Sequence, residues 1–267
     1  MQTESRERIF GRNAVFEVLR AGRRAVTALD VAEGAEARGG LKRLLDQAAR
    51  SSVTVRRVPR SLLDRESDSH QGVAATVEVY PYVGVEDILE RAARLHEQPF
   101  ILLLDLIQNP QNLGTLLRTA EAVGVHGVIL AAHRAVGITP AVVSSSSGAC
   151  EHLRVARGNL SQAMARLQQA GVWLVGLESA PEARPLHDVD LAGPLGLVVG
   201  NEGEGMRRLV RQSCDLLVQL PMRGEVDSLN AAVAGSLGLY AAWAARGYAG
   251  WRPGAPGVGY IDGGAES

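Results

Sequence analysis

The sequence is poor in lysine: Lys42 is the only lysine among 28 basic residues, so almost every cationic side chain is an arginine. Arginine suits phosphate recognition because its planar guanidinium offers several donors, although genome composition explains most of such a bias. The formal net charge is −1, and it is spread unevenly. Residues 1–80 hold 14 basic and 11 acidic residues, whereas the rest holds 14 and 18. The overall charge therefore gives no indication of a nucleic-acid partner.

Cysteine and long apolar runs are also scarce. Cys150 and Cys214 are too few for a disulfide framework and lack the spacing of a metal site, so we expect two buried thiols and no metal. The six histidines are scattered, and none has a catalytic spacing to a serine, cysteine or aspartate. The start of the sequence is charged and no apolar run reaches membrane-spanning length. We therefore expect a soluble, cytoplasmic protein with no membrane segment.

Aromatic residues make up 4% of the chain, against 46% hydrophobic residues in total. Alanine, valine, leucine and glycine dominate, which favours covered parallel strands and closely packed helices over an aromatic-lined barrel. After residue 98, short apolar runs alternate with segments of helical period, the pattern of a parallel sheet wrapped by helices. These predicted strands are 100–104, 127–130, 172–177, 195–199 and 216–220.

The region before residue 81 forms a smaller α/β unit. It contains predicted helices at 13–19 and 41–50 and strands at 28–31, 53–58 and 72–79. The resulting divisions are a disordered start (1–8), a first unit (9–80), a linker with a lead-in helix (81–97), a second unit (98–248) and a disordered tail rich in glycine and proline (249–267).

A polar turn follows the apolar run at 100–104, where open α/β sheets place their ligands. It runs from Asp105 to Arg118 and holds Asn109 and Asn112. Beyond it, apolar residues follow the spacing of an amphipathic helix whose buried stripe leaves Arg118 outside. Gly114 would let a ligand approach the helix start, where free N–H groups favour anions. For any one of these residues alone, a capped turn with a solvated arginine is the simpler interpretation.

Two more polar turns leave the same expected edge of the sheet. The first, Gly200-Asn-Glu-Gly-Glu-Gly, has its glycines in the reverse order of the dinucleotide fingerprint, which argues against a nicotinamide site. Glu202 in it could simply complement a helix dipole. In the second turn, at 222–230, Ser228 has the usual features of a helix N-cap, whereas Asn230 is harder to explain that way. A helix rich in alanine and glycine follows and must pack closely against a neighbour.

Together these three segments resemble, in order and spacing, the three motifs of the SpoU (TrmH) family of SPOUT methyltransferases. The first motif is matched by 109–118, the second by 199–205 and the third by 220–230, and the likeness covers roughly 100–248. The first unit, with Phe10-Gly-Arg-Asn-Ala and His70-Gln-Gly-Val-Ala, is similar to the RNA-binding substrate domain of RlmB-type members.

The resemblance implies a C-terminal parallel-sheet domain of SPOUT type with a trefoil knot, preceded by a small α/β RNA-binding domain. S-adenosylmethionine would sit in the knot, with its adenine held mostly by backbone groups around Gly200, Leu220, Met222 and Leu229. Members work as homodimers whose active site is completed across the interface.

The implied reaction is 2′-O-methylation of a ribose in RNA. Arg118 matches the family's catalytic arginine; a guanidinium gives up its proton at great cost, so we expect it to bind the neighbouring phosphate and stabilise the developing alkoxide. Asn112, Glu202, Ser228 and Asn230 match positions that shape the site or orient the ribose. Members often carry a basic residue near 142–148, where this chain has four serines. Arg134, Arg154 or the N-terminal arginines would then supply phosphate affinity.

The leading hypothesis is a methyltransferase for a guanosine ribose in 23S rRNA, because the first unit resembles the rRNA-type substrate domain. The alternatives are a tRNA 2′-O-methyltransferase and a catalytically silent RNA-binding factor of ribosome assembly. The presence together of Asn112, Arg118, Glu202 and Asn230 argues against a silent factor.

Overall fold

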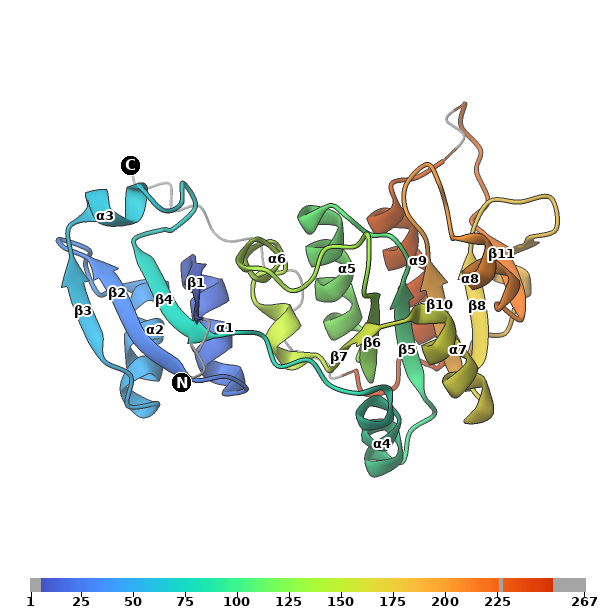
Figure 1. Cartoon of the computed structure of the whole chain (residues 1–267), viewed down its shortest axis with the longest axis horizontal. Helices are drawn as coiled ribbons and strands as arrows, with labels where there is room; N and C mark the ends of the chain where they lie inside the picture. Colours follow the sequence, from blue (N-terminus) through green and yellow to red (C-terminus); the bar gives the residue numbers. More distant parts are fainter. Residues whose placement is uncertain (1–5, 226–227, 252–267) are drawn as a thin grey trace.

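A computed structural model describes residues 6–225 and 228–251 and shows two α/β units side by side (Figure 1). The first unit has a sheet in the order β1-β4-β2-β3, where β2 and β3 are parallel and the other pairs antiparallel. Residues of α1 and α2 fill one face, and Leu63 of α3 packs on the other. Its elements are β1 (Arg6–Phe10), α1 (Arg12–Ala21), β2 (Val26–Ala32), α2 (Gly39–Arg50), β3 (Val55–Val58), α3 (Arg60–Asp64) and β4 (Val73–Glu78).

The second unit is built on a parallel sheet of seven strands in the order β7-β6-β5-β10-β8-β11-β9. The predicted alternation of strands and helices is therefore confirmed. Its elements are α4 (Val85–Leu95), β5 (Phe100–Leu104), α5 (Pro110–Ala122), β6 (Gly127–Ala131), α6 (Pro140–Ser145), η1 (Ala149–His152), β7 (Val155–Gly158), α7 (Leu160–Gln169), β8 (Trp173–Leu177), β9 (Arg184–Pro185), η2 (Leu186–Asp188), β10 (Leu195–Val199), α8 (Arg208–Gln212), β11 (Leu216–Gln219) and α9 (Ala231–Ala245).

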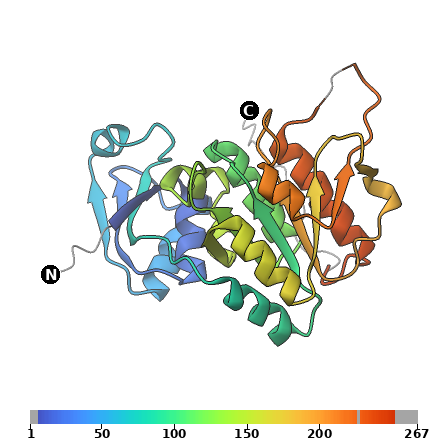
Figure 2. The same ribbon diagram turned by 45° about the vertical axis from the view of Figure 1, so that its right-hand side comes forward.

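Helices cover both faces of this sheet, which explains why its central strands are continuous apolar runs. Residues of α4, α7 and α8 pack on one face, and those of α5, α6 and α9 on the other. Figures 1 and 2 show α7 in front of the sheet and α9 behind it. The small residues of α9 allow the close packing that we predicted: a Cβ on Gly235 would lie 2.5 Å from Leu116 of α5.

Several local predictions were wrong. Arg6 to Arg8 belong to β1, so this part of the predicted disordered start is an ordered strand. The four serines at 144–147, which we expected to lie inside a helix, are only half helical, because α6 ends at Ser145 and Ser147 has a φ of 53°. Gly114 faces Ser145, whose Oγ would be 2.0 Å from an added Cβ, so this glycine serves helix packing rather than ligand approach. The predicted tail lies outside the described residues from 252 onward.

The two units are joined through a buried ion pair. Arg24, two residues before β2, donates from Nη2 to Glu151 of η1 at 2.5 Å, and both side chains are almost fully buried. A second donor of the same guanidinium reaches Glu7 of β1 at 3.0 Å. Nearby, the Tyr80 hydroxyl donates to the carbonyls of Cys150 and Leu153. The first unit is thus fixed against the second by directional bonds as well as apolar packing.

The two cysteines behave as packing groups. Cys150 is buried and Cys214 half-buried, and both are free thiols; burial raises the pKa of each to about 12.

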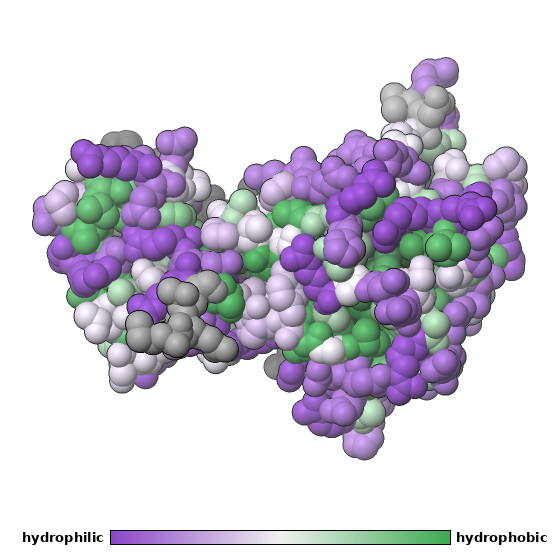
Figure 3. Space-filling model, viewed as in Figure 1, coloured by the Kyte–Doolittle hydropathy of each residue, from purple (hydrophilic) through white to green (hydrophobic). Residues whose placement is uncertain are grey.

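Within 6–225 and 228–251, no helix is long and apolar enough to span a bilayer. Figure 3 shows a predominantly hydrophilic face with small, separate apolar patches.

Candidate active site

Three loops meet at the carboxyl edge of the parallel sheet, as the sequence predicted. They follow β5, β10 and β11 and lead into α5, α8 and α9. The first is shaped by Asn109, whose side chain accepts a hydrogen bond from Gln111 N at 2.7 Å and so begins α5 at Pro110. Parallel strands present all their carboxyl ends at one edge, which is why segments about 90 residues apart in the chain share one site.

Asn112, Glu202 and Asn230 form one hydrogen-bonded cluster, which brings one residue from each loop together. The Asn230 amide donates to Glu202 Oε2 at 2.8 Å and to Asn112 Oδ1 at 3.2 Å. The Asn112 amide is 3.5 Å from the same Glu202 oxygen. One carboxylate oxygen therefore positions two amides, and no described residue bonds the second oxygen, Oε1, which can accept from another donor.

Asn230 is the N-cap of α9, contrary to our expectation that Ser228 would have this role. Its Oδ1 accepts from Ala232 N at 2.9 Å and from Val233 N at 3.4 Å. The oxygen of the side chain thus starts the helix while its nitrogen joins the cluster. Ser228 is exposed and lines the neighbouring cavity.

The loop at 200–205 is closed by its own backbone and is anchored just beyond its end by Arg207. Asn201 and Gly205 exchange two backbone hydrogen bonds, and a Cβ on Gly200 would lie 2.4 Å from Gly205 C, so the loop closes only around glycine. Asp105, fully buried after β5, accepts from both the backbone and the guanidinium of Arg207 at 2.8 Å.

Glu178 is a further supporting residue that our sequence reasoning missed. It directly follows β8, and its Oε2 accepts from Met206 N at 3.2 Å. A carboxylate immediately after a buried strand was the available signal, because this position lies at the same carboxyl edge.

A cavity of about 280 Å³ lies beside the cluster, between the loops after β10 and β11. Gly200, Leu220, Met222 and Leu229, the four residues predicted to hold the cofactor, all line it, together with Glu202 and Ser228. The lining combines apolar side chains with backbone groups of Gly200 and its neighbours. Such a wall suits a ligand with a flat heteroaromatic ring and polar edges. Among the described residues, no group of three or more potential ligands could hold a metal ion.

Arg118 lies apart from the cluster. It is six residues beyond Asn112 on α5, about 9 Å along the axis, on another side of the helix. It is exposed, and its Nη1 is 3.5 Å from Ser147 Oγ. Within one chain, the fold therefore assembles Asn112, Glu202 and Asn230 but not Arg118.

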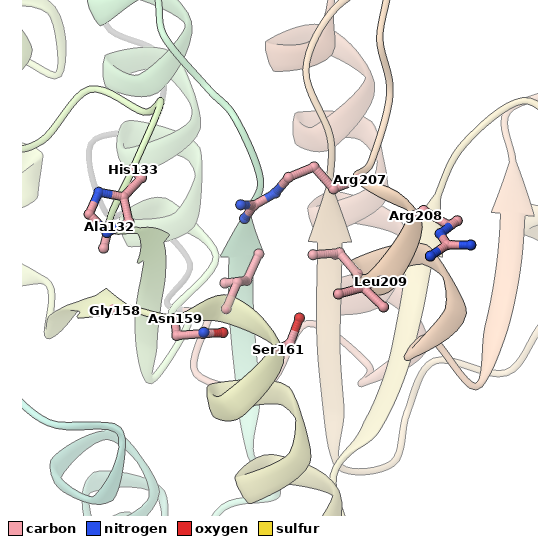
Figure 4. A pocket seen from close by; sticks show the side chains of 10 residues that line it. Ala132, His133, Gly158, Asn159, Ser161, Arg207, Arg208 and Leu209 are labelled. Carbon is pink, nitrogen blue, oxygen red and sulfur yellow. The ribbon is translucent and has the colours of Figure 1, made fainter.

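A second cavity, of about 470 Å³, lies at the same edge beyond β6 and β7 (Figure 4). Figure 4 shows Arg207 extending toward the end of β5, whereas Arg208 points to the opposite side. Asp105 pairs with Arg207 and so neutralises the charge of this one arginine of the lining.

Comparison with known families agrees with this geometry. Residues 99–240 match the SpoU rRNA Methylase family, and residues 8–83 match the substrate-binding domain of RNA 2′-O ribose methyltransferases. The chain belongs to the SpoU family. YacO of Bacillus subtilis, which bears the name TrmH family tRNA/rRNA methyltransferase, is 39% identical over 91% of this chain and 98% of its own length.

Solved SpoU structures share the fold. The SpoU methyltransferase AviRb from Streptomyces viridochromogenes, solved with AdoMet, has a TM-score of 0.76 and 26% identity, with 91% of each chain covered. A TrmH/SpoU tRNA modifying enzyme from A. aeolicus has a TM-score of 0.51 and 26% identity, and covers 61% of this chain and 85% of its own. The SpoU protein described here is an RNA methyltransferase, and S-adenosylmethionine is its cofactor.

Proposed function

We propose that this SpoU protein transfers a methyl group from S-adenosylmethionine to the 2′-hydroxyl of a guanosine ribose in 23S rRNA. The observation that carries the choice of rRNA is the first unit: residues 8–83 match a substrate-binding domain, and the A. aeolicus tRNA modifying enzyme aligns with only 61% of the chain. A tRNA substrate is the alternative. Both reactions take place on RNA in the cytoplasm.

The residues of the site divide the work of the reaction. The bound cofactor supplies an electrophilic methyl group, and we assign its adenine to the cavity lined by Gly200, Leu220, Met222 and Leu229. Asn112, Glu202 and Asn230, with Ser228 at the rim, would orient the ribose so that its hydroxyl faces the methyl carbon. The guanidinium of Arg118 would hold the adjacent phosphate and stabilise the negative charge that develops as the hydroxyl loses its proton.

We further propose a homodimer in which Arg118 of one copy completes the site of the other. Leu229, Val233, Leu237 and Tyr240 form an apolar stripe along α9, each between 36% and 47% exposed. The stripe starts at the cofactor cavity, since Leu229 lines both. An exposed apolar stripe of this kind marks an interaction surface. We expect the second copy to cover it, and we expect the chain between β10 and α9 to form the family's trefoil knot.

Mapping of 2′-O-methyl groups tests the substrate. In a strain lacking the protein, one guanosine methylation in 23S rRNA should disappear by mass spectrometry, and the purified protein should restore it. Loss of a tRNA methylation alone would reject the rRNA assignment.

A catalytically silent assembly factor would bind RNA but not the cofactor. Calorimetric titration with S-adenosylmethionine distinguishes this case, because absence of binding at millimolar cofactor would favour it.

A further inference from the structure

A third cavity, of about 680 Å³, lies where the two units meet, away from the active site. Its walls come from the end of α1, the connection at 81–83, α4 and the segment between η1 and β7. These elements lie at the amino-terminal ends of the strands, in the lower middle of Figure 1. No step of the methyl transfer uses this region.

Four arginines line this cavity: Arg23, Arg91, Arg94 and Arg154. Glu151 is the one carboxylate of its lining in the part of the chain that the structure describes, and it is fully buried and bound to Arg24. The cavity therefore has a strong positive charge that its own walls do not balance.

The hydrogen bonds of these arginines leave their charges largely uncompensated. Arg23 donates to the Tyr80 hydroxyl and to the carbonyls of Leu153 and Pro81, which are neutral. Among the described residues, Arg91 donates to the His126 carbonyl alone, at 3.5 Å. Arg94 has a distant ion pair with Glu90 at 3.9 Å, and no side chain in 6–225 and 228–251 bonds the Arg154 guanidinium.

The pKa of Arg91 shows the effect of these uncompensated charges. Burial lowers the pKa of its guanidinium, and the charges of Arg154 and Arg23 lower it further, while Glu97 and Glu121 act weakly in the opposite direction. Like charges held together in a partly desolvated place are unfavourable unless an anion joins them. The arrangement is what a site for a multiply charged anion requires.

We infer that this cavity binds the phosphodiester backbone of the RNA substrate at a point remote from the methylated ribose. Arginine forks match phosphate oxygens with paired hydrogen bonds. Tyr82, 38% exposed in the same cavity, offers a surface on which an unpaired base can stack. Because the walls come from both units, bound RNA would also hold the substrate domain against the catalytic domain. This inference rests on the proposed RNA substrate.

Removal of single charges tests the site. The variants Arg154→Gln and Arg94→Gln should each weaken binding of fluorescein-labelled polyuridylate roughly tenfold and reduce the slope of log affinity against log salt by about one. The matched control is Arg184→Gln, an exposed arginine on β9 at the far edge of the sheet, which should change neither. Because like charges are removed, Arg154→Gln should not lower the melting temperature.

Methylation kinetics test this phosphate site independently of the proposed function. With 23S rRNA, Arg154→Gln should raise KM about as much as it weakens binding and leave kcat unchanged. If the unchanged enzyme methylates rRNA but neither Arg154→Gln nor Arg94→Gln alters KM, affinity or salt slope, the inference is wrong and the proposed function stands. Inorganic tripolyphosphate should compete with polyuridylate at this site. If it binds the unchanged protein in an Arg154-dependent way while RNA binding is independent of Arg154, the cavity serves a free anion instead.

Discussion

Asn230 and Glu202 are joined by a 2.8 Å hydrogen bond, and this one contact links the loop after β11 to the loop after β10. The same asparagine caps α9 with its oxygen. Its position therefore affects both the orientation of Glu202 and the start of the helix that carries the exposed apolar stripe. The two functions use different atoms of one side chain, so they can be separated by substitution.

Replacement of Asn230 by serine or alanine separates its capping role from its contacts with Glu202 and Asn112. Serine keeps an oxygen that can cap α9, whereas alanine removes the cap and should cost about 1 kcal/mol of stability. Both lack the amide that holds Glu202 and Asn112, so we expect kcat to fall on the order of a hundredfold in both. Turnover assays and thermal melting check this. Normal turnover of Asn230→Ser would show that the amide has no part in the reaction.

Local sequence patterns predicted the central strands and the three loops because each depends on its own residues. The apolar run at 100–104 has to be covered on both faces, and Asn109-Pro110 has to begin a helix. β1 was missed because its first three residues, Arg-Glu-Arg, are all charged, which is typical of a polar chain start. β7 and β9 were missed because short edge strands have little apolar content.

Long-range polar pairs could not be predicted in the same way. Asp105 and Arg207 are 102 positions apart, and Arg24 and Glu151 are 127 positions apart. A charged residue in an apolar sequence indicates that a partner exists, but its identity depends on the completed fold. The capping role of Asn230 was missed for a related reason, since the exact first residue of a helix is a weak sequence signal.

The Arg24–Glu151 pair should be essential to docking of the two units. Removing one partner leaves a charge buried without its counterion, so Arg24→Met or Glu151→Leu alone should cost about 3–5 kcal/mol of stability. The combined variant should be less costly than either single one, because no fully buried charge is left without a partner and only the partly exposed Glu7 loses its contact with Arg24. Urea unfolding measures all three.

The control for this pair is the exposed ion pair of Arg38 and Glu36, whose side chains are 85% and 68% exposed. Arg38→Met should leave the unfolding midpoint unchanged, because solvent screens such pairs. Equal effects of Arg24→Met and Arg38→Met would contradict an important role for the buried pair.

His126 should make stability depend on pH. Its buried Nδ1 accepts from Phe100 N at 3.0 Å, so this nitrogen has no proton in the folded state. Burial lowers the pKa of the ring, with smaller effects from Arg91 and Arg246 in the same direction and from Glu97 in the opposite one. The unfolded chain then binds the proton more tightly. The contribution to stability is present above the ordinary histidine pKa of about 6.5 and is lost as pH falls below it.

The variant His126→Asn tests this dependence, because its side-chain oxygen can accept from Phe100 N but does not titrate. The melting temperature of the unchanged protein should fall more between pH 7 and pH 5 than that of His126→Asn. His187, whose side chain is 67% exposed, provides the control, and His187→Asn should keep the original dependence. Identical pH profiles for the unchanged protein and His126→Asn would show that His126 is not the source of the pH dependence of stability.

Subunit mixing tests whether Arg118 acts across a dimer. Arg118→Ala and Asn230→Ser should each have strongly reduced activity as pure proteins. If each site combines Arg118 of one copy with Asn230 of the other, a mixed dimer has one site with both residues intact and one with neither. Activity should therefore return when the two proteins exchange subunits, up to half that of the unchanged dimer for each mixed dimer formed. If both residues act in the same copy, neither site of the mixed dimer is intact and mixing restores nothing. The absence of restored activity, with mixed dimers verified by native mass spectrometry, would place Arg118 outside the partner's site.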